Sequence, residues 1–167
     1  MNRNLIVYFS RSGNNYVSGR IVNLEVGNTK IAAKMIQDIT GGELFEIVPV
    51  EKYSDDYDAC TREAKAHLNA NARPDFVDPL DDIAEYDTIY VGYPNYWGTM
   101  PVHVMTFLER YDFSGKTIKP FCTHEGSGLG HSVSDIKKMC PRAMVEKGLA
   151  ITGSTVKNSR KVLEKWI

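Results

Sequence analysis

The chain alternates between two kinds of apolar pattern. Five short runs rich in β-branched and aromatic residues predict strands, and the segments between them, where apolar residues recur every three or four positions, predict helices. Strands that alternate with helices are typical of an α/β fold, in which a parallel sheet lies between two layers of helices. The predicted strands are residues 5–9, 44–50, 88–93, 116–123 and 143–151.

The helices are predicted from their apolar faces and from the residues that mark their ends. The first begins near residue 28 or 29, with Asn28 as a plausible N-cap, and ends before Gly41-Gly42. Others are predicted over residues 55–71, 132–140 and 158–167 and directly after Pro101. The 55–71 helix has a weak inner stripe that consists of Tyr57, Cys60, Ala64 and Leu68.

Two of these helices carry finer signals. Ser132 and Asp135 have the spacing of a capping box at the start of a helix. In the last helix, the apolar side is predicted to consist of Val162, Leu163 and Trp166.

Residues 13–26 do not have a helical pattern. Ser18-Gly19 is a turn dipeptide, and Val22, Leu24 and Val26 alternate with polar residues. We therefore predict a small hairpin or an irregular excursion between the first strand and the first helix.

Composition excludes several classes of protein. The net charge is −1, so no overall field favours nucleic acid or an anionic membrane. Cys60, Cys122 and Cys140 are widely spaced, which argues against a disulfide framework and a metal site and favours buried or idle thiols. No apolar run approaches membrane-spanning length, and no linker or repeat divides the chain. We expect a single cytoplasmic domain over residues 1–167, as a monomer or weak dimer.

Three loops follow the predicted first, third and fourth strands. They are residues 10–29, 94–101 and 124–130, and they are the loops richest in Gly, Ser, Thr, Asn and aromatic residues. In open parallel sheets, ligands bind beyond the carboxyl ends of the strands. The three loops are therefore expected to share one binding rim.

The first loop has the donors that a phosphate requires. Ser10, Ser12, Asn28 and Thr29 offer hydroxyl and amide groups at the start of a helix, and Arg11 can add charge. The sequence lacks the glycine-rich motifs of triphosphate and dinucleotide sites. Taken alone, strand ending and helix capping explain Ser10 and Asn28 about as well as phosphate binding does.

The other two loops suit a flat ligand. Tyr96 and Trp97 can stack on a conjugated ring, although packing against the 51–86 connection explains them equally well. The third loop offers backbone N–H groups and two titratable residues, His124 and Glu125, each of which alone is more often a solvated loop residue.

Together and in this order, the loops resemble those of the flavodoxin family, and the resemblance covers the whole chain. Family phosphate loops resemble Ser-x-Thr-Gly-Asn-Thr. Here Ser10-Arg11 and, after an insertion, Gly27-Asn28-Thr29 resemble that pattern; a rival alignment uses residues 10–15 directly. We prefer the split alignment because residues 16–27 contain two glycines and many β-branched residues and make a poor helix.

The resemblance implies a three-layer α/β/α sandwich with a five-stranded parallel sheet of order 2-1-3-4-5 and with flavin mononucleotide (FMN) at its edge. It implies no metal ion and no catalytic side chain. The residues implied to bind FMN are Ser10, Arg11, Ser12, Asn28, Thr29, Pro94, Asn95, Tyr96, Trp97, Gly98, Thr99, Thr123, His124, Glu125, Gly126 and Gly128.

The function that the resemblance implies first is a single-electron carrier between a reductase and redox partner proteins. The resemblance implies that a flavodoxin carrier is strongly acidic and that its surface charge steers docking, whereas this chain is nearly neutral. The alternative is therefore a flavodoxin-like NAD(P)H-dependent reductase of quinones, FMN or another small acceptor. A flavin-free signalling or binding module is a third possibility, disfavoured because the first and third strands do not end in acidic residues.

Reduction places negative charge at the pyrimidine edge of a flavin. Stacking on Trp97 or Tyr96 without a nearby lysine or arginine would oppose that charge, as would Glu125, whereas protonated His124 would favour it. We therefore expect a low potential for the second electron. By family analogy, the backbone at Gly98-Thr99 is expected to contact the flavin N5.

Overall fold

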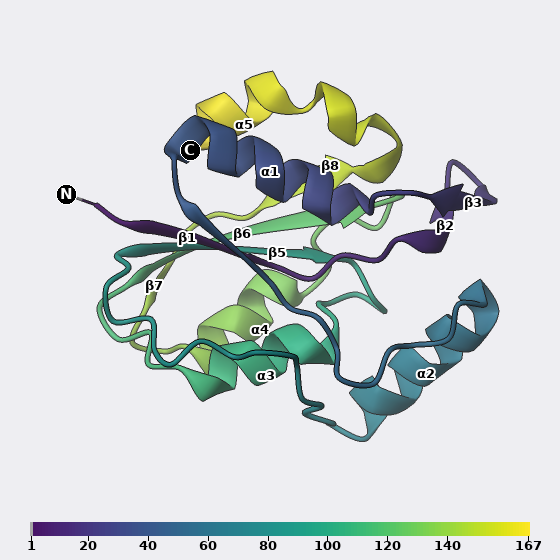
Figure 1. The fold of residues 1–167 in the computed structure, drawn as a ribbon, viewed down its shortest axis with the longest axis horizontal. Helices are drawn as coiled ribbons and strands as arrows, with labels where there is room; N and C mark the ends of the chain where they lie inside the picture. The colour runs from purple at the N-terminus through teal and green to yellow at the C-terminus, as the bar shows by residue number, and fades with distance from the viewer. Residues whose placement is uncertain (1) are drawn as a thin grey trace.

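The computed structural model describes residues 2–167, and its centre is a parallel sheet (Figure 1). The strands run in the order β4 (Glu43–Glu46), β1 (Asn4–Tyr8), β5 (Thr88–Pro94) and β6 (Thr117–His124). Two short strands, β7 (Met144–Val145) and β8 (Leu149–Thr152), both pair with β6 in parallel. The predicted order 2-1-3-4-5 is confirmed, with the fifth strand split in two.

Helices cover both faces of the sheet (Figure 1). One layer consists of α1 (Asn28–Thr40), the 3-10 helix η1 (Gly153–Asn158) and α5 (Arg160–Trp166). The other contains α3 (Val102–Arg110) and α4 (Ser132–Met139). None of the helices within residues 2–167 is long and apolar enough to cross a membrane.

The central strands are buried on both faces because alternate side chains point to opposite helix layers. In β1, Leu5 and Val7 pack in the larger core cluster, whereas Ile6 and Tyr8 pack in the smaller cluster with Ile36 of α1. This double burial explains the unbroken apolar run from which the strand was predicted.

Two further elements extend beyond the carboxyl ends of the strands. The predicted excursion at residues 13–26 is an antiparallel hairpin, β2 (Gly13–Val17) and β3 (Arg20–Leu24), which confirms the hairpin interpretation. The helix predicted over residues 55–71 is α2 (Tyr57–Asn69), which projects past the sheet on the same side as the hairpin (Figure 1).

Helix capping is where the sequence predictions were wrong. The N-cap of α1 is Gly27, and Asn28 is already helical. Capping comes from the loop after β1, because Ser10 Oγ accepts the Lys30 N–H at 3.1 Å. Such a distant partner leaves no trace in the local sequence.

The predicted capping box of α4 is also wrong. The Ser132 hydroxyl donates to the Leu129 carbonyl at 2.6 Å and accepts from Tyr93 at 2.8 Å, so it does not cap the helix. The Asp135 carboxylate forms hydrogen bonds with the side chains of Thr99 and His131 and does not cap the helix either. In the last helix, Leu163 is fully buried, but Val162 is 45% exposed and does not belong to the inner face.

All three cysteines are free and buried. Within residues 2–167, no group of three or more His, Cys, Asp or Glu side chains is placed to hold a metal ion.

Candidate functional site

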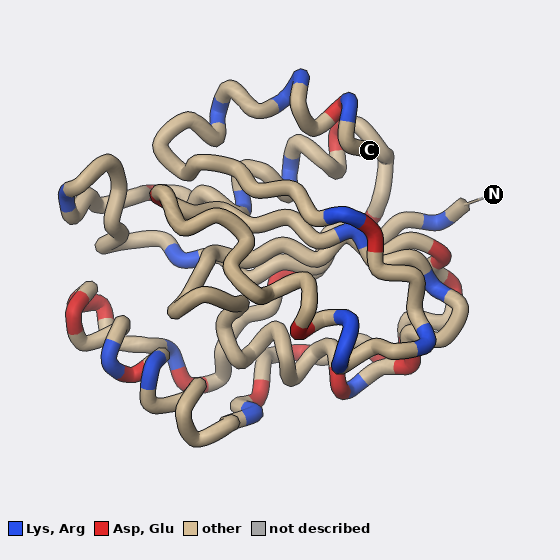
Figure 2. The backbone as a smooth tube through the Cα atoms, turned by 180° about the vertical axis from the view of Figure 1, so that it is seen from behind, with Lys and Arg blue, Asp and Glu red and all other residues tan. Residues whose placement is uncertain are grey.

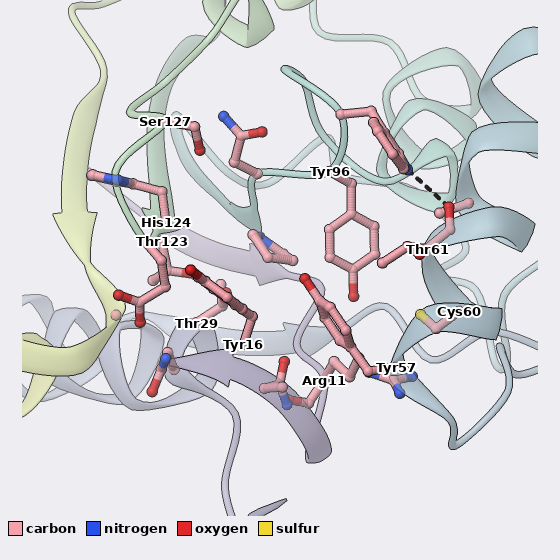
Figure 3. Close-up of a pocket in the computed structure, with 18 of the residues that line it drawn as sticks. Arg11, Tyr16, Thr29, Tyr57, Cys60, Thr61, Tyr96, Thr123, His124 and Ser127 are labelled. Carbon is pink, nitrogen blue, oxygen red and sulfur yellow. Dashed lines mark hydrogen bonds between the residues drawn. The ribbon is translucent and has the colours of Figure 1, made fainter. Parts of the chain in front are cut away.

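A cavity of about 560 Å³ opens at the carboxyl edge of the sheet (Figure 3). All three predicted loops contribute to its wall, and so do the hairpin and α2. Eleven of the sixteen predicted FMN-binding residues line it: Arg11, Asn28, Thr29, Pro94, Asn95, Tyr96, Trp97, Gly98, Thr123, His124 and Glu125.

The other five predicted residues lie near the cavity without lining it. Ser10 caps α1, and the Thr99 hydroxyl is turned away to donate to Asp135 at 2.6 Å. The Gly128 carbonyl accepts from Asn95 Nδ2 at 2.8 Å. Ser12 and Gly126 are exposed. These residues shape the loops that form the wall.

One end of the cavity lies at the N-terminus of α1. The first N–H groups of a helix have no intrahelical partner and attract negative charge. Asn28 and Thr29 lie at this point, and the Thr29 and Thr123 hydroxyls are 2.7 Å apart, which ties α1 to β6. The start of α1 also lies directly against the loop after β1. Gly27 permits this contact, because a Cβ there would lie 2.2 Å from Ser10 Oγ and 2.6 Å from the Arg11 carbonyl oxygen.

Two polar atoms in the cavity wall lack partners among the described residues. Glu125 Oε1 and the Tyr96 hydroxyl are both buried without a hydrogen bond. Buried polar atoms normally find a partner, so these two are positions where a ligand can supply one. A ligand with hydroxyl groups and ring nitrogens fits this pair, and FMN is such a ligand.

The aromatic loop is a tight, strained turn. Trp97 and Gly98 both have positive φ, 57° and 87°, and Tyr96 and Thr99 pair across them, with the Tyr96 N–H donating to the Thr99 carbonyl at 2.8 Å. Two positive φ values are typical of a type I′ turn, in which tryptophan at the first position is unfavourable. The turn therefore holds the Trp97 side chain in place at a cost in backbone energy.

The peptide groups of this turn are already engaged. The Gly98 N–H donates to Asn95 Oδ1 at 2.9 Å, and the Gly98 carbonyl accepts from the His131 N–H at 2.8 Å. The Thr99 carbonyl accepts from the Tyr96 N–H, and the Thr99 N–H donates to the Tyr96 carbonyl at 3.3 Å. A ligand atom such as the flavin N5 would have to share these partners.

Below this turn, α4 acts as a support. Asp135 Oδ2 accepts the Thr99 hydroxyl at 2.6 Å and lies 2.7 Å from His131 Nδ1. Gly130 passes so close that a Cβ on it would lie 2.1 Å from the Gly98 carbonyl oxygen. The carboxylate predicted to cap α4 therefore anchors the aromatic loop.

The structure gives Tyr96 and Trp97 a place in the cavity wall and gives Trp97 a second contact on α2. Each lines the cavity, and Trp97 also packs on the long connection, because its Nε1–H donates to the Thr61 carbonyl of α2 at 2.9 Å (Figure 3). The Tyr96 ring packs edge-on against Phe9, and burial raises the pKa of its hydroxyl well above the usual range.

The sequence analysis missed the wall formed by the hairpin and α2. Tyr16 stacks on Tyr57 with ring centroids 6.4 Å apart, and Arg11 and Asn14 both donate to the Asp55 carbonyl, at 3.1 and 3.2 Å. The stripe on α2 was the available signal. Cys60 and Ala64 are buried in the core, as expected of an inner stripe, and together with Tyr57 they also line the cavity. The missed lining residues are Asn15, Tyr16, Tyr57, Cys60, Thr61, Ala64, Ser127 and Gly153.

Two positively charged side chains lie in or near the wall that contains the aromatic loop. Arg11 lines the cavity and has no carboxylate partner within residues 2–167. Lys65 Nζ lies 4.6 Å from the centre of the Trp97 ring. The argument for a low second potential therefore loses one of its supports.

Solved structures with this architecture include several flavoproteins. A protein of Bacteroides uniformis ATCC 8492, provisionally described as a flavoprotein, is 28% identical with a TM-score of 0.77, and the match covers 99% of this chain and 97% of that one. A similarly described protein of Bacteroides eggerthii DSM 20697 is 26% identical, with a TM-score of 0.74 and 98% of each chain covered. A flavoprotein of Lactobacillus acidophilus NCFM in complex with FMN shares the fold at 24% identity and TM-score 0.66, over 95% of this chain and 98% of that one.

No curated protein matches the chain. A family model described as Flavodoxin matches residues 3–167, which is nearly the entire sequence. The protein therefore belongs to the flavodoxin family.

Proposed function

We propose that this protein binds FMN in the cavity and carries electrons, one at a time, between a reductase and redox partner proteins. The observation that carries the proposal is the convergence of three loops, far apart in the sequence, on one cavity with a helix N-terminus at one end and two aromatic side chains in its wall. Membership of the flavodoxin family supports the same ligand.

Each part of FMN has a suitable group in the wall. Asn28 and Thr29 at the start of α1 would hold the phosphate. Glu125 Oε1 and the Tyr96 hydroxyl would accept from or donate to the polar atoms of the sugar chain and ring. Tyr96 and Trp97 would pack against the ring and exclude water. FMN itself supplies the electron chemistry when bound.

The visible spectrum and a turnover assay test this proposal. We expect purified protein loaded with FMN to be yellow, to accept electrons from an added flavodoxin reductase and to oxidise NAD(P)H very slowly without one. Protein that stays colourless after incubation with FMN would contradict the cofactor assignment. Rapid NAD(P)H oxidation without a reductase would contradict the carrier role.

A second candidate is an NAD(P)H-dependent reductase of small acceptors. The observation that favours it is the wall formed by α2: the Tyr16–Tyr57 stack and the Trp97–Thr61 hydrogen bond close one side of the cavity. A small flat acceptor enters such a space more easily than the surface of a protein does. Steady-state turnover with quinones as acceptors separates the two candidates.

We also propose a monomer or weak dimer that works in the cytoplasm. Three buried free thiols suit a reducing compartment. Sedimentation at several protein concentrations and localisation of the tagged chain test these two statements.

A further inference from the structure

Helix α2 holds the indole of Trp97 at two points. The Thr61 carbonyl accepts from Nε1 at 2.9 Å, and the Lys65 ammonium lies over the ring, 4.6 Å from its centre. Residues four positions apart lie on one face of a helix, so one stretch of α2 provides both contacts. Figure 3 shows the hydrogen bond to Thr61 as a dashed line.

The backbone of Trp97 is fixed independently of α2. Its positive φ of 57° is set by the turn between Tyr96 and Thr99, and the His131 N–H holds the neighbouring Gly98 carbonyl at 2.8 Å. The indole is therefore held from the loop and from the helix at once.

Lys65 lies over the Trp97 ring but is not part of the cavity wall. Trp97 lines the cavity, whereas Lys65 does not. Lys65 forms no ion pair within residues 2–167, so no carboxylate there neutralises its charge.

We propose that Lys65 is a positioning residue that raises the second reduction potential of the bound flavin by acting through Trp97. The inference rests on the proposed function, because it requires FMN in the cavity. The faces of an indole are electron-rich and repel the negative charge of a reduced flavin. An ammonium on the opposite face draws that electron density toward itself and reduces the repulsion.

The effect is limited by solvent. Lys65 is exposed, so salt screens its charge. Cation–π interactions at exposed sites correspond to roughly a two- to fivefold change in an equilibrium constant. We therefore expect removal of the charge to weaken the binding of fully reduced FMN, relative to one-electron-reduced FMN, by about two- to fivefold.

Four variants test the proposal by spectroelectrochemical titration of the FMN-loaded protein at low and high salt. Lys65→Gln removes the charge, Lys65→Glu reverses it and Lys65→Arg keeps it. Lys161→Gln is the matched control, because Lys161 is an exposed lysine on α5 in the other helix layer. Thermal unfolding and the affinity for oxidised FMN show whether each variant remains folded and loaded.

We expect K65Q to lower the second potential, K65E to lower it further, and K65R and K161Q to resemble the original protein. High salt should shrink the differences. A second potential in K65Q equal to that in K161Q would overturn the proposal. A K65R shift as large as that of K65Q would also overturn it, because it would show that the packing of the side chain, and not its charge, sets the potential. Failure of the unmodified protein to bind FMN would instead contradict the proposed function.

Discussion

At the residue scale, glycine at position 130 permits the aromatic loop to approach α4. Gly130 has a φ of +56°, and a Cβ there would lie 2.1 Å from the Gly98 carbonyl oxygen. We expect Gly130→Ala to displace the loop and to weaken FMN binding by about tenfold or more, because a displacement of an ångström in a site is costly. Flavin fluorescence titration measures this change.

Gly115 provides the matched control for this variant. Its φ is +76°, but a Cβ there would meet nothing within 4 Å. Gly115→Ala should lose about 1 kcal/mol of stability from backbone strain and keep its FMN affinity. Equal FMN affinities in the two variants would show that the Gly130 contact does not position the loop.

A buried histidine makes stability depend on pH. His103 is fully buried, stacks on Phe9 and lies near Tyr53 and His67, and neither of its ring nitrogens has a hydrogen bond within residues 2–167. Burial, with a smaller contribution from His67, lowers the pKa of His103 from 6.5 to about 4. The ring is therefore neutral in the folded protein throughout the neutral range.

The sign of the effect follows from which state binds the proton. Between pH 6.5 and about 4 the unfolded chain protonates His103 and the folded chain does not, so stability falls as pH falls through this window. The loss attributable to His103 is about 3 kcal/mol at most, and it is absent above pH 6.5. We expect urea unfolding of His103→Leu to show a correspondingly weaker pH dependence. An unchanged dependence would contradict the assignment.

At the element scale, the hairpin contributes to the cavity wall. Asn15 and Tyr16 line the cavity, and Tyr16 stacks on Tyr57 of α2. Removal of residues 14–25 should leave the main sheet and α1 intact, since β2 and β3 form a separate two-stranded sheet. We expect FMN affinity to fall by roughly tenfold, the value of one buried aromatic contact.

Point variants separate the wall from the rest of the hairpin. Tyr16→Ala should account for most of the lost affinity. Ile21→Ala is the matched control, because Ile21 pairs with Tyr16 across the hairpin and is 51% exposed but does not line the cavity. Unchanged FMN affinity and electron-transfer rates in the shortened chain would show that the hairpin is dispensable for the site.

Elements were predictable where a single periodic pattern decides the structure. The buried strands, the hairpin and α2 follow from alternation, turn residues and helical spacing. The stripe on α2 could not be interpreted fully, because Cys60 and Ala64 have the same apolar character whether they face a core or a cavity. The roles of Asn28 and Asp135 in capping were misjudged. Ser10, 20 residues before Lys30, caps α1 in place of Asn28, and Asp135 bonds to Thr99, 36 residues away.

At the scale of the whole molecule, a net charge near zero conceals a separation of charge. Residues 43–112 contain fifteen Asp or Glu and five Lys or Arg, whereas the remainder contains six and fifteen. Figure 2 marks both kinds on the backbone. The net charge of −1 is therefore a weaker argument against an electron carrier, because it averages an acidic segment and a basic remainder.

This separation predicts how electron transfer responds to salt. If a protein partner docks on the acidic segment, transfer to a basic haem protein should slow as ionic strength rises, because screening removes the steering field. Transfer to an uncharged quinone should be unaffected. Stopped-flow oxidation of the reduced protein measures both rates, and equal salt dependence for the two acceptors would contradict docking through charge.

The central claim is that the cavity at the carboxyl edge of the sheet is an FMN site. Its most direct test is equilibrium titration of flavin-free protein with FMN, followed by flavin fluorescence. We predict quenching that saturates at one FMN per chain and that weakens in Gly130→Ala but not in Gly115→Ala. Flavin fluorescence that remains unchanged at excess protein would contradict the claim.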